Sequence, residues 1–403
     1  MITNISTVIH APLFNILFLV AVAWSVAIFL ERFRIPLIIG ELIAGIIIGP
    51  TVLNIVRPSP EINILAQLGM FFLMFYAGLE TNPRLIQKIA AKSILIGGLG
   101  TIFPFCFGIL ASLLFGCTWP QALLIGAAIS GTSMVTKSRI LSDLKLMKTL
   151  LGYHMMAAAI VDNLFSFLIV SLIIKGFQRG SFEISDLVFT ALEVTLFFAI
   201  ILTVGYLLFP RISHYFKTRR GKGFTFALLV GFSFAFLAEL INLPFILGAY
   251  LAGLFVREEI MSASLFSKMN DRFLAITHGF LGPIFIISIA FKMNFQVLLT
   301  HSWLLFWLIL AAFFGKFCGI YLGAMANRFN RVGSLIMAVG MNGRGTVELV
   351  LAVIGLQMGI INQAQFSILV LVAFLTTLSV PLLLNIIIKK NPVTTQKILQ
   401  PFP

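Results

Sequence analysis

The chain has 403 residues, of which 60% are hydrophobic and only 10% are charged. Soluble domains are roughly 45–50% apolar and about 25% charged, so this composition excludes a soluble globular protein and predicts an all-α polytopic membrane protein. The formal net charge of +14 does not indicate a nucleic-acid partner, because the basic residues lie in short loops between apolar runs.

Apolar runs of about 20 residues, the length of a transmembrane helix, follow one another along the chain. We predict about thirteen transmembrane helices from this pattern. They lie at residues 10–30, 36–54, 62–79, 93–115, 121–137, 150–174, 187–209, 223–240, 244–256, 273–291, 302–325, 333–356 and 365–388.

The 28 Lys and Arg residues fall mostly in alternate loops. One set of alternate loops holds most of them, and Lys137 is counted in that set. The other set holds only Arg57, Lys175, Arg179 and Lys292. Because cytoplasmic loops carry the excess of Lys and Arg, we expect an N-terminus outside, a C-terminus inside and a cytoplasmic (inner) membrane location.

An internal repeat is visible in ERFRIPLIIGELIAG (31–45) and ELINLPFILGAYLAG (239–253), which share Glu, Pro, Gly, Ala and Gly at equal spacing. The first segment enters from the cytoplasm and the second from outside, so residues 36–174 and 244–388 are predicted to form two inverted five-helix repeats. Shared Pro and Gly punctuation without a common fold is the alternative.

The fifth and twelfth spans contain poor helix formers at corresponding repeat positions, at 131–133 and 343–346. Broken helices at membrane depth are tolerated where they are buried or line a cavity. Two of them predict crossed broken helices around a midplane binding site. Two Gly-rich packing helices are the alternative.

Asp162 is the one charge in the run from Met155 to Ile174, and Lys316 lies halfway along another apolar run. An isolated charge at membrane depth normally meets a partner or lines a cavity. We expect these two residues to pair, with a proton and a monovalent cation competing for Asp162. A purely structural ion pair is the alternative.

Other polar residues of these spans are candidates for supporting roles. Asn163 offers an amide oxygen, and Ser166 shares the Asp162 face of the helix. Arg344 and Glu348, at i and i+4, are expected mainly to neutralise each other. His154, two turns from Asp162, is a candidate sensor or simply an interfacial histidine.

No motif of an enzyme or an ATPase occurs in the chain, so we expect no catalytic residues, no cofactor and no metal beyond a transported monovalent cation. The energy source is then an ion gradient.

The motifs FRIPLIIGELIAGIIIGPTVL, FFLMFYAGLETNP, GTSMVTKSRILSDLKLM, GKFCG and GMNGRGTVELVLA resemble, in this order, the membrane domain of the monovalent cation:proton antiporters, in the Kef-type and NapA-type branch. The resemblance implies elevator-type homodimers with a scaffold and a mobile core, driven by exchange of Na⁺ or K⁺ for H⁺. It places Thr132, Ser133, Asp162 and Lys316 at the ion site.

The resemblance also implies a division of the chain. The expected parts are scaffold at 1–80 and 223–292, transport core at 88–176 and 301–388, a linker helix and basic loop at 187–222, and a cytoplasmic tail at 389–403.

The sequence departs from the family at the ion site. Many sodium-transporting members have Asp-Asp where this chain has Asp162-Asn163. In an ungapped register the second, ion-binding carboxylate is replaced by Asn163, and a slip of one residue restores Asp162 to that place. A non-transporting sensor or scaffold that kept the fold therefore stays open as an alternative. A sodium-coupled symporter of an organic anion on a related ten-helix fold is another alternative.

Overall fold

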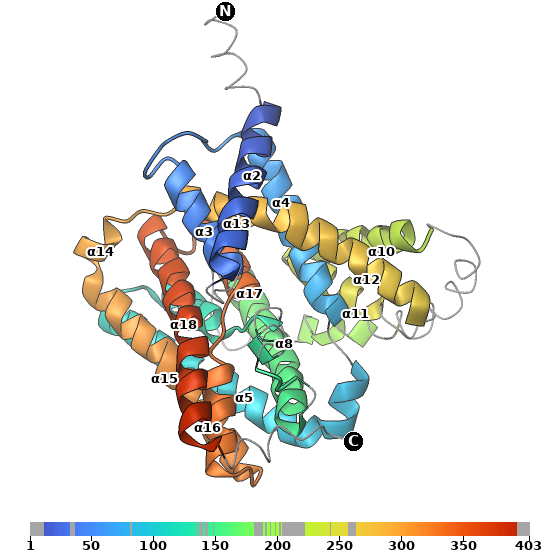
Figure 1. Cartoon of the computed structure of the whole chain (residues 1–403), viewed down its shortest axis with the longest axis vertical. Helices are drawn as coiled ribbons and strands as arrows, with labels where there is room; N and C mark the ends of the chain where they lie inside the picture. The colour runs from blue at the N-terminus through green and yellow to red at the C-terminus, as the bar shows by residue number, and fades with distance from the viewer. Residues whose placement is uncertain are drawn as a thin grey trace, which may run out of the picture. The chain divides into compact units, whose positions relative to one another are not determined.

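In the computed structural model, every regular element of the described ranges is a helix (Figure 1). The described residues are 12–32, 37–80, 83–134, 149–180, 222–241, 243–256 and 263–392, with scattered positions at 137–147 and 188–203. The helices are α2 (Pro12–Glu31), α3 (Leu37–Ile48), α4 (Pro60–Glu80), α5 (Pro83–Leu114), α6 (Trp119–Ser130), α8 (Leu150–Arg179), α10 (Lys222–Leu240), α11 (Phe245–Phe255), α12 (Ala263–Ile276), the π-helical turn η1 (Thr277–Leu281), α13 (Gly282–Phe291), α14 (Val297–Thr300), α15 (Ser302–Ala326), α16 (Arg331–Gly340), α17 (Thr346–Gln357) and α18 (Gln363–Lys390).

Eight described stretches of helix are long and apolar enough to cross a membrane, and five shorter apolar helices have 10–17 residues. The predicted span at 187–209 lies largely outside the described residues, as do most of the basic loop up to 222 and the tail beyond 392. Every other predicted span overlaps at least one described helix, and the span at 333–356 corresponds to the pair α16 and α17.

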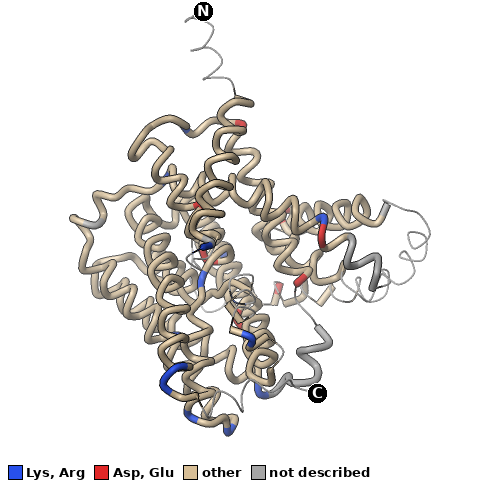
Figure 2. The backbone as a smooth tube through the Cα atoms, in the orientation of Figure 1, with Lys and Arg blue, Asp and Glu red and all other residues tan. Residues whose placement is uncertain are grey.

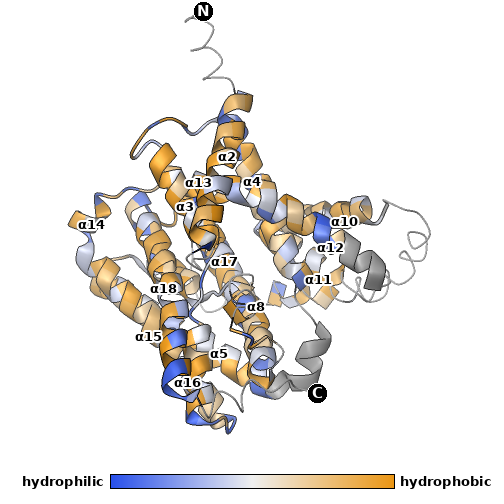
Figure 3. Cartoon of the chain, in the orientation of Figure 1, coloured by the Kyte–Doolittle hydropathy of each residue, from blue (hydrophilic) through white to orange (hydrophobic). Residues whose placement is uncertain are grey.

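Most residues of the described helices are apolar, as the orange that covers most of the ribbon in Figure 3 shows. On α15 the exposed side chains include Trp303, Phe306 and Phe314. Figure 2 shows most of the described backbone without charge, and basic segments gather where α15 ends and α16 begins. Large apolar side chains exposed along helices of this length belong in lipid, so the protein is a multi-pass membrane protein.

The chain forms two compact units, each assembled from two separate stretches of sequence. The first unit contains residues 1–79 and 205–294. Within it, α4 and α11 approach closely at two glycines, because a Cβ on Gly78 would overlap the Tyr250 carbonyl oxygen and a Cβ on Gly253 would overlap that of Phe75. Small residues at such crossings let membrane helices pack backbone to backbone.

The second unit contains residues 80–204 and 295–403, with α5 packed against α6, α8 and α15. Gly315 and Gly319 of α15 face α5, where an added Cβ would meet Pro104 Cα at 2.6 Å or overlap the Leu99 carbonyl oxygen. The sequence GKFCG therefore sets a close crossing and brings Lys316 beside α5.

Both predicted breaks are present in the second unit. Helix α6 ends at Ser130, residues 131–133 are not helical, and helical backbone resumes at Met134. Likewise α16 ends at Gly340 and α17 begins at Thr346. The Ser133 amide donates to the Gly343 carbonyl oxygen at 3.3 Å, so the two breaks lie side by side. This arrangement confirms the predicted pair of crossed broken helices.

Candidate functional site

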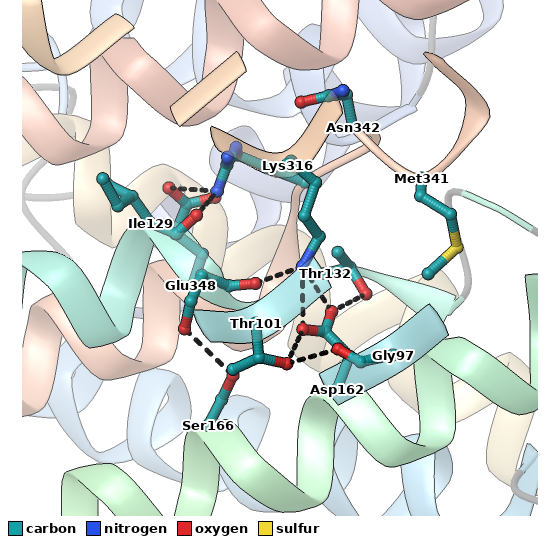
Figure 4. A network of polar contacts seen from close by, with 12 residues as sticks. Gly97, Thr101, Ile129, Thr132, Asp162, Ser166, Lys316, Met341, Asn342 and Glu348 are labelled. Atoms are coloured by element: carbon teal, nitrogen blue, oxygen red, sulfur yellow. Dashed lines mark hydrogen bonds and ion pairs between the residues drawn. The ribbon is translucent and has the colours of Figure 1, made fainter. Parts of the chain in front are cut away.

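Asp162 lies on α8 with no exposed surface, and both of its carboxylate oxygens accept hydrogen bonds (Figure 4). Lys316 Nζ donates to Oδ1 and to Oδ2, each at 2.7 Å. Thr101 Oγ1 donates to Oδ1 at 2.6 Å, and Thr132 Oγ1 donates to Oδ2 at 2.7 Å. The pairing of Asp162 with Lys316 that the sequence predicts is therefore present in the structure.

Thr101 is a contact of Asp162 that the sequence analysis missed. It lies on α5 one turn after Gly97, and a Cβ on Gly97 would lie 2.6 Å from the Ala158 carbonyl oxygen of α8. This glycine lets α8 approach α5 closely enough for the Thr101 hydroxyl to reach the carboxylate. The small-residue run GGLGT at 97–101 was the available signal, because such runs mark close helix crossings.

The C-terminal end of α6 is held by two buried cations. The last carbonyls of a helix have no partner within it and carry partial negative charge. Lys316 Nζ donates to the Ser130 carbonyl oxygen, and Arg344 Nη1 donates to that of Ile129. Arg344 Nη2 also donates to the Ala312 carbonyl oxygen of α15 at 2.7 Å. Breaking the helix thus exposes carbonyls that Lys316 and Arg344 satisfy.

The second break, between α16 and α17, is hydrogen-bonded to Thr377 of α18. Its hydroxyl accepts from the Arg344 amide and donates to the Arg344 carbonyl oxygen, each at 2.9 Å. Glu348, in the first turn of α17, has Oε1 3.9 Å from Arg344 Nη1, which matches the predicted neutralising pair. Within the described residues neither Glu348 oxygen has a hydrogen-bond partner.

The structure corrects the sequence analysis at Lys137, which it had counted among the cytoplasmic loop residues. The side chain is completely buried, and Nζ donates to Thr132 Oγ1 at 2.9 Å and to Met341 Sδ at 3.1 Å. The Ser133 amide and the Lys137 ammonium both contact residues of the second break, so Lys137 points into the protein. A lysine at the end of an apolar run looks the same in sequence whether it turns outward or inward.

The remaining predicted site residues are placed differently. Asn163 is buried, and neither of its amide atoms has a partner among the described residues, so Asp162 alone of this pair meets Thr132 and Lys316. Ser166 Oγ lies 3.3 Å from Ser130 Oγ, at the end of α6. Ser133 takes part through its backbone amide.

His154 contacts other parts of the second unit. Its Nδ1 lies 3.1 Å from Ser93 Oγ, and its ring packs edge-on against Phe329 with centroids 5.1 Å apart. These contacts favour a structural role over direct participation at Asp162.

Comparison with known proteins gives consistent matches. The family model described as sodium/hydrogen exchanger, transmembrane, matches residues 16–390. The Na⁺/H⁺-K⁺ antiporter GerN of Bacillus cereus is 30% identical over 352 residues, which cover 87% of this chain and 89% of GerN. An Na⁺/H⁺ antiporter of Enterococcus hirae is 28% identical over 383 residues, covering 93% and 98% of the two chains.

The fold has a match among solved structures. The sodium proton antiporter MjNhaP1 of Methanocaldococcus jannaschii superposes with a TM-score of 0.67 at 15% identity, over 95% of this chain and 97% of that one. The likeness shows a shared antiporter fold, in agreement with the crossed broken helices. Together with the family match over nearly the whole length, it leads to one conclusion: this chain belongs to the sodium/hydrogen exchanger family.

Proposed function

We propose that this protein exchanges a monovalent cation, Na⁺ or K⁺, for H⁺ across the cytoplasmic membrane, and that Asp162 holds the proton and the cation in turn. The observation that carries this proposal is a fully buried carboxylate beside two broken helices, in a chain of the sodium/hydrogen exchanger family. Relatives named as Na⁺/H⁺ antiporters support exchange over symport of an organic anion.

The oxygen atoms around Asp162 suit a hard cation. The two carboxylate oxygens, the Thr132 hydroxyl and the Ser130 carbonyl all lie around the Lys316 ammonium or one hydrogen bond from it. Carboxylate, hydroxyl and carbonyl oxygens are the ligands that hard cations prefer. Without a bound cation, the ammonium of Lys316 neutralises Asp162. A bound cation takes over that neutralisation, and Lys316 must then shift or release its proton.

Alternating access requires one part of the protein to move against another. We assign the transport core to the second unit, which contains all the residues around Asp162, and the scaffold and dimerisation surface to the first unit. In this assignment the protein works as an elevator-type homodimer with its N-terminus outside and its C-terminus inside.

The test is proton flux in proteoliposomes that contain a pH-sensitive dye, challenged in turn with Na⁺, K⁺ and Li⁺. Wild-type protein is expected to exchange protons for at least one of these cations, and Asp162→Asn to abolish the exchange. Glu41→Gln is the matched control, because Glu41 is another buried carboxylate and lies on α3 in the first unit. Full exchange by Asp162→Asn would refute the proposed role of Asp162.

One observation favours a second candidate function. Both Asp162 oxygens already accept from protein donors, and Asn163 supplies no second carboxylate. A carboxylate that is already bonded through both oxygens, with no second carboxylate beside it, suits a sensor that binds a cation without transporting it. Cation binding by detergent-solubilised protein, without proton flux in sealed proteoliposomes, is the result expected of a sensor.

A further inference from the structure

Lys137 is a buried basic residue at the proposed exchange site. It has no part in the proposed exchange of a cation for a proton at Asp162. Its Nζ donates to Thr132 Oγ1, the same hydroxyl oxygen that donates its proton to Asp162 Oδ2. The ammonium is therefore separated from the carboxylate by one hydroxyl group. The described residues bring three buried basic side chains (Lys137, Lys316 and Arg344) and two buried acidic ones (Asp162 and Glu348) to the two breaks and their partners, which is a formal excess of one basic group.

The contacts of Lys137 are weaker than those of Lys316. Lys316 Nζ donates to both oxygens of a carboxylate and to a helix-terminal carbonyl. Among the described residues, the acceptors of Lys137 are a neutral hydroxyl and the thioether sulfur of Met341, which is a weak acceptor. An ammonium with three donors and such acceptors is held loosely and can be displaced at lower cost than Lys316.

We propose that Lys137 is a specificity-determining residue of the exchange site: its ammonium is a tethered cation that competes with the transported cation for Thr132 Oγ1. This inference rests on the proposed function, because it concerns affinity at the same site. A cation bound by Asp162 Oδ2 and Thr132 Oγ1 takes the hydroxyl lone pairs that Lys137 uses. It also meets the charge of Lys137 at close range in a buried site, where repulsion is weakly screened.

Two consequences follow for transport. Cation binding requires the Lys137 side chain to withdraw from Thr132, so the apparent affinity is lower than the oxygen ligands alone would provide. Withdrawal also changes the contact with Met341 at the second break, so occupancy of the site is linked to the position of that break.

The experiment compares charge and shape at position 137. Lys137→Met removes the charge and keeps an unbranched side chain, Lys137→Gln keeps a donor for Thr132 without charge, and Lys137→Arg keeps the charge. Lys175→Met is the matched control, because Lys175 is also a buried lysine of the second unit. Its Nζ lies 2.6 Å from Glu193 Oε2, and both residues are distant in sequence from the two breaks.

The apparent KM for the transported cation is measured in proteoliposomes for each variant. Lys137→Met and Lys137→Gln are expected to lower KM by about tenfold or more, the usual effect of a like charge a few ångströms from a charged site. Lys137→Arg and Lys175→Met are expected to keep the wild-type KM. An unchanged KM in both neutral variants, in protein that remains monodisperse, would overturn the inference.

A second measurement does not depend on transport. The thermal transition of detergent-solubilised protein is followed as Na⁺ or K⁺ replaces choline, and the cation concentration at half-maximal stabilisation is determined. A lower midpoint for Lys137→Gln than for wild type supports the inference even if no variant exchanges protons, in which case only the proposed exchange fails. Equal midpoints would refute the competition between Lys137 and the cation, whatever the flux.

Discussion

The two helix breaks differ in how their polar groups are satisfied. At the first break, side chains make most of the contacts: Thr132 meets Asp162 and Lys137, and the last carbonyls of α6 are met by Lys316 and Arg344. One backbone bond, from the Ser133 amide to the Gly343 carbonyl oxygen, joins this break to the second. At the second break the backbone is held by a side chain of another helix, because the Thr377 hydroxyl hydrogen-bonds to both the amide and the carbonyl oxygen of Arg344.

This difference separates two tasks within one unit. The hydrogen bonds of the first break are made by hydroxyl and charged groups that a proton or a cation can replace, so they suit a site that changes its occupant. The bonds of the second break hold a fixed backbone geometry from which Arg344 reaches the end of α6. Substitutions at the first break should therefore change cation affinity, and substitutions at the second should change stability.

The largest expected effect comes from Arg344→Leu, which removes one of the links between the two breaks. It leaves the Ile129 and Ala312 carbonyls without this donor and removes the cation closest to Glu348. Removing one partner of a buried ion pair costs about 3–5 kcal/mol, so we expect a large fall in the thermal transition in detergent. Arg331→Leu is the control, because Arg331 is exposed at the start of α16. Equal transitions for the two variants would contradict the linking role of Arg344.

Thr132→Val tests the first break without changing side-chain volume much. The valine neither donates to Asp162 nor accepts from Lys137. A hydrogen bond to a charged group contributes about 1.5–3 kcal/mol, which corresponds to roughly a tenfold to hundredfold change in apparent cation affinity. The measurement is KM for the cation in proteoliposomes, and a wild-type KM would mean that Thr132 does not contact the bound cation.

Thr377→Val is the matching substitution at the second break. It removes both hydrogen bonds to the Arg344 backbone and leaves a buried amide and carbonyl without this partner. We expect a loss of about 1–2 kcal/mol in the free energy of unfolding, measured by denaturant titration in mixed micelles. The cation KM of the folded protein should remain close to that of wild type. A change in KM as large as that of Thr132→Val would erase the distinction between the breaks.

The smallest effect is expected for Asn163→Leu. The buried amide has no hydrogen-bond partner among the described residues, so a leucine of similar size removes an unfavourable desolvation without losing a bond. The thermal transition should be unchanged or slightly higher, and exchange should persist. Loss of exchange in well-folded Asn163→Leu protein would show that this amide binds the cation, in line with the ungapped family register.

The sequence predicted the features that depend on local composition. Runs of apolar residues predict membrane helices because every backbone polar group in lipid must be satisfied within the helix. The clusters at 131–133 and 343–346 predicted the breaks because glycines and hydroxyl residues destabilise the interior of a helix. The pairing of Asp162 with Lys316 was predictable because each charge stands alone in an apolar run and needs a partner.

The tertiary structure decided which other groups meet Asp162. Thr101 lies 61 residues before Asp162, and its contact depends on how closely α5 and α8 pack at Gly97. Lys137 lies at the end of an apolar run, where sequence predicts a solvated lysine, and only the fold of the broken span turns it toward Thr132. The hydrophobic pattern of the sequence predicts the position of a residue along a helix. Which way a long side chain turns, and which helix it faces, is set by packing between segments far apart in the chain.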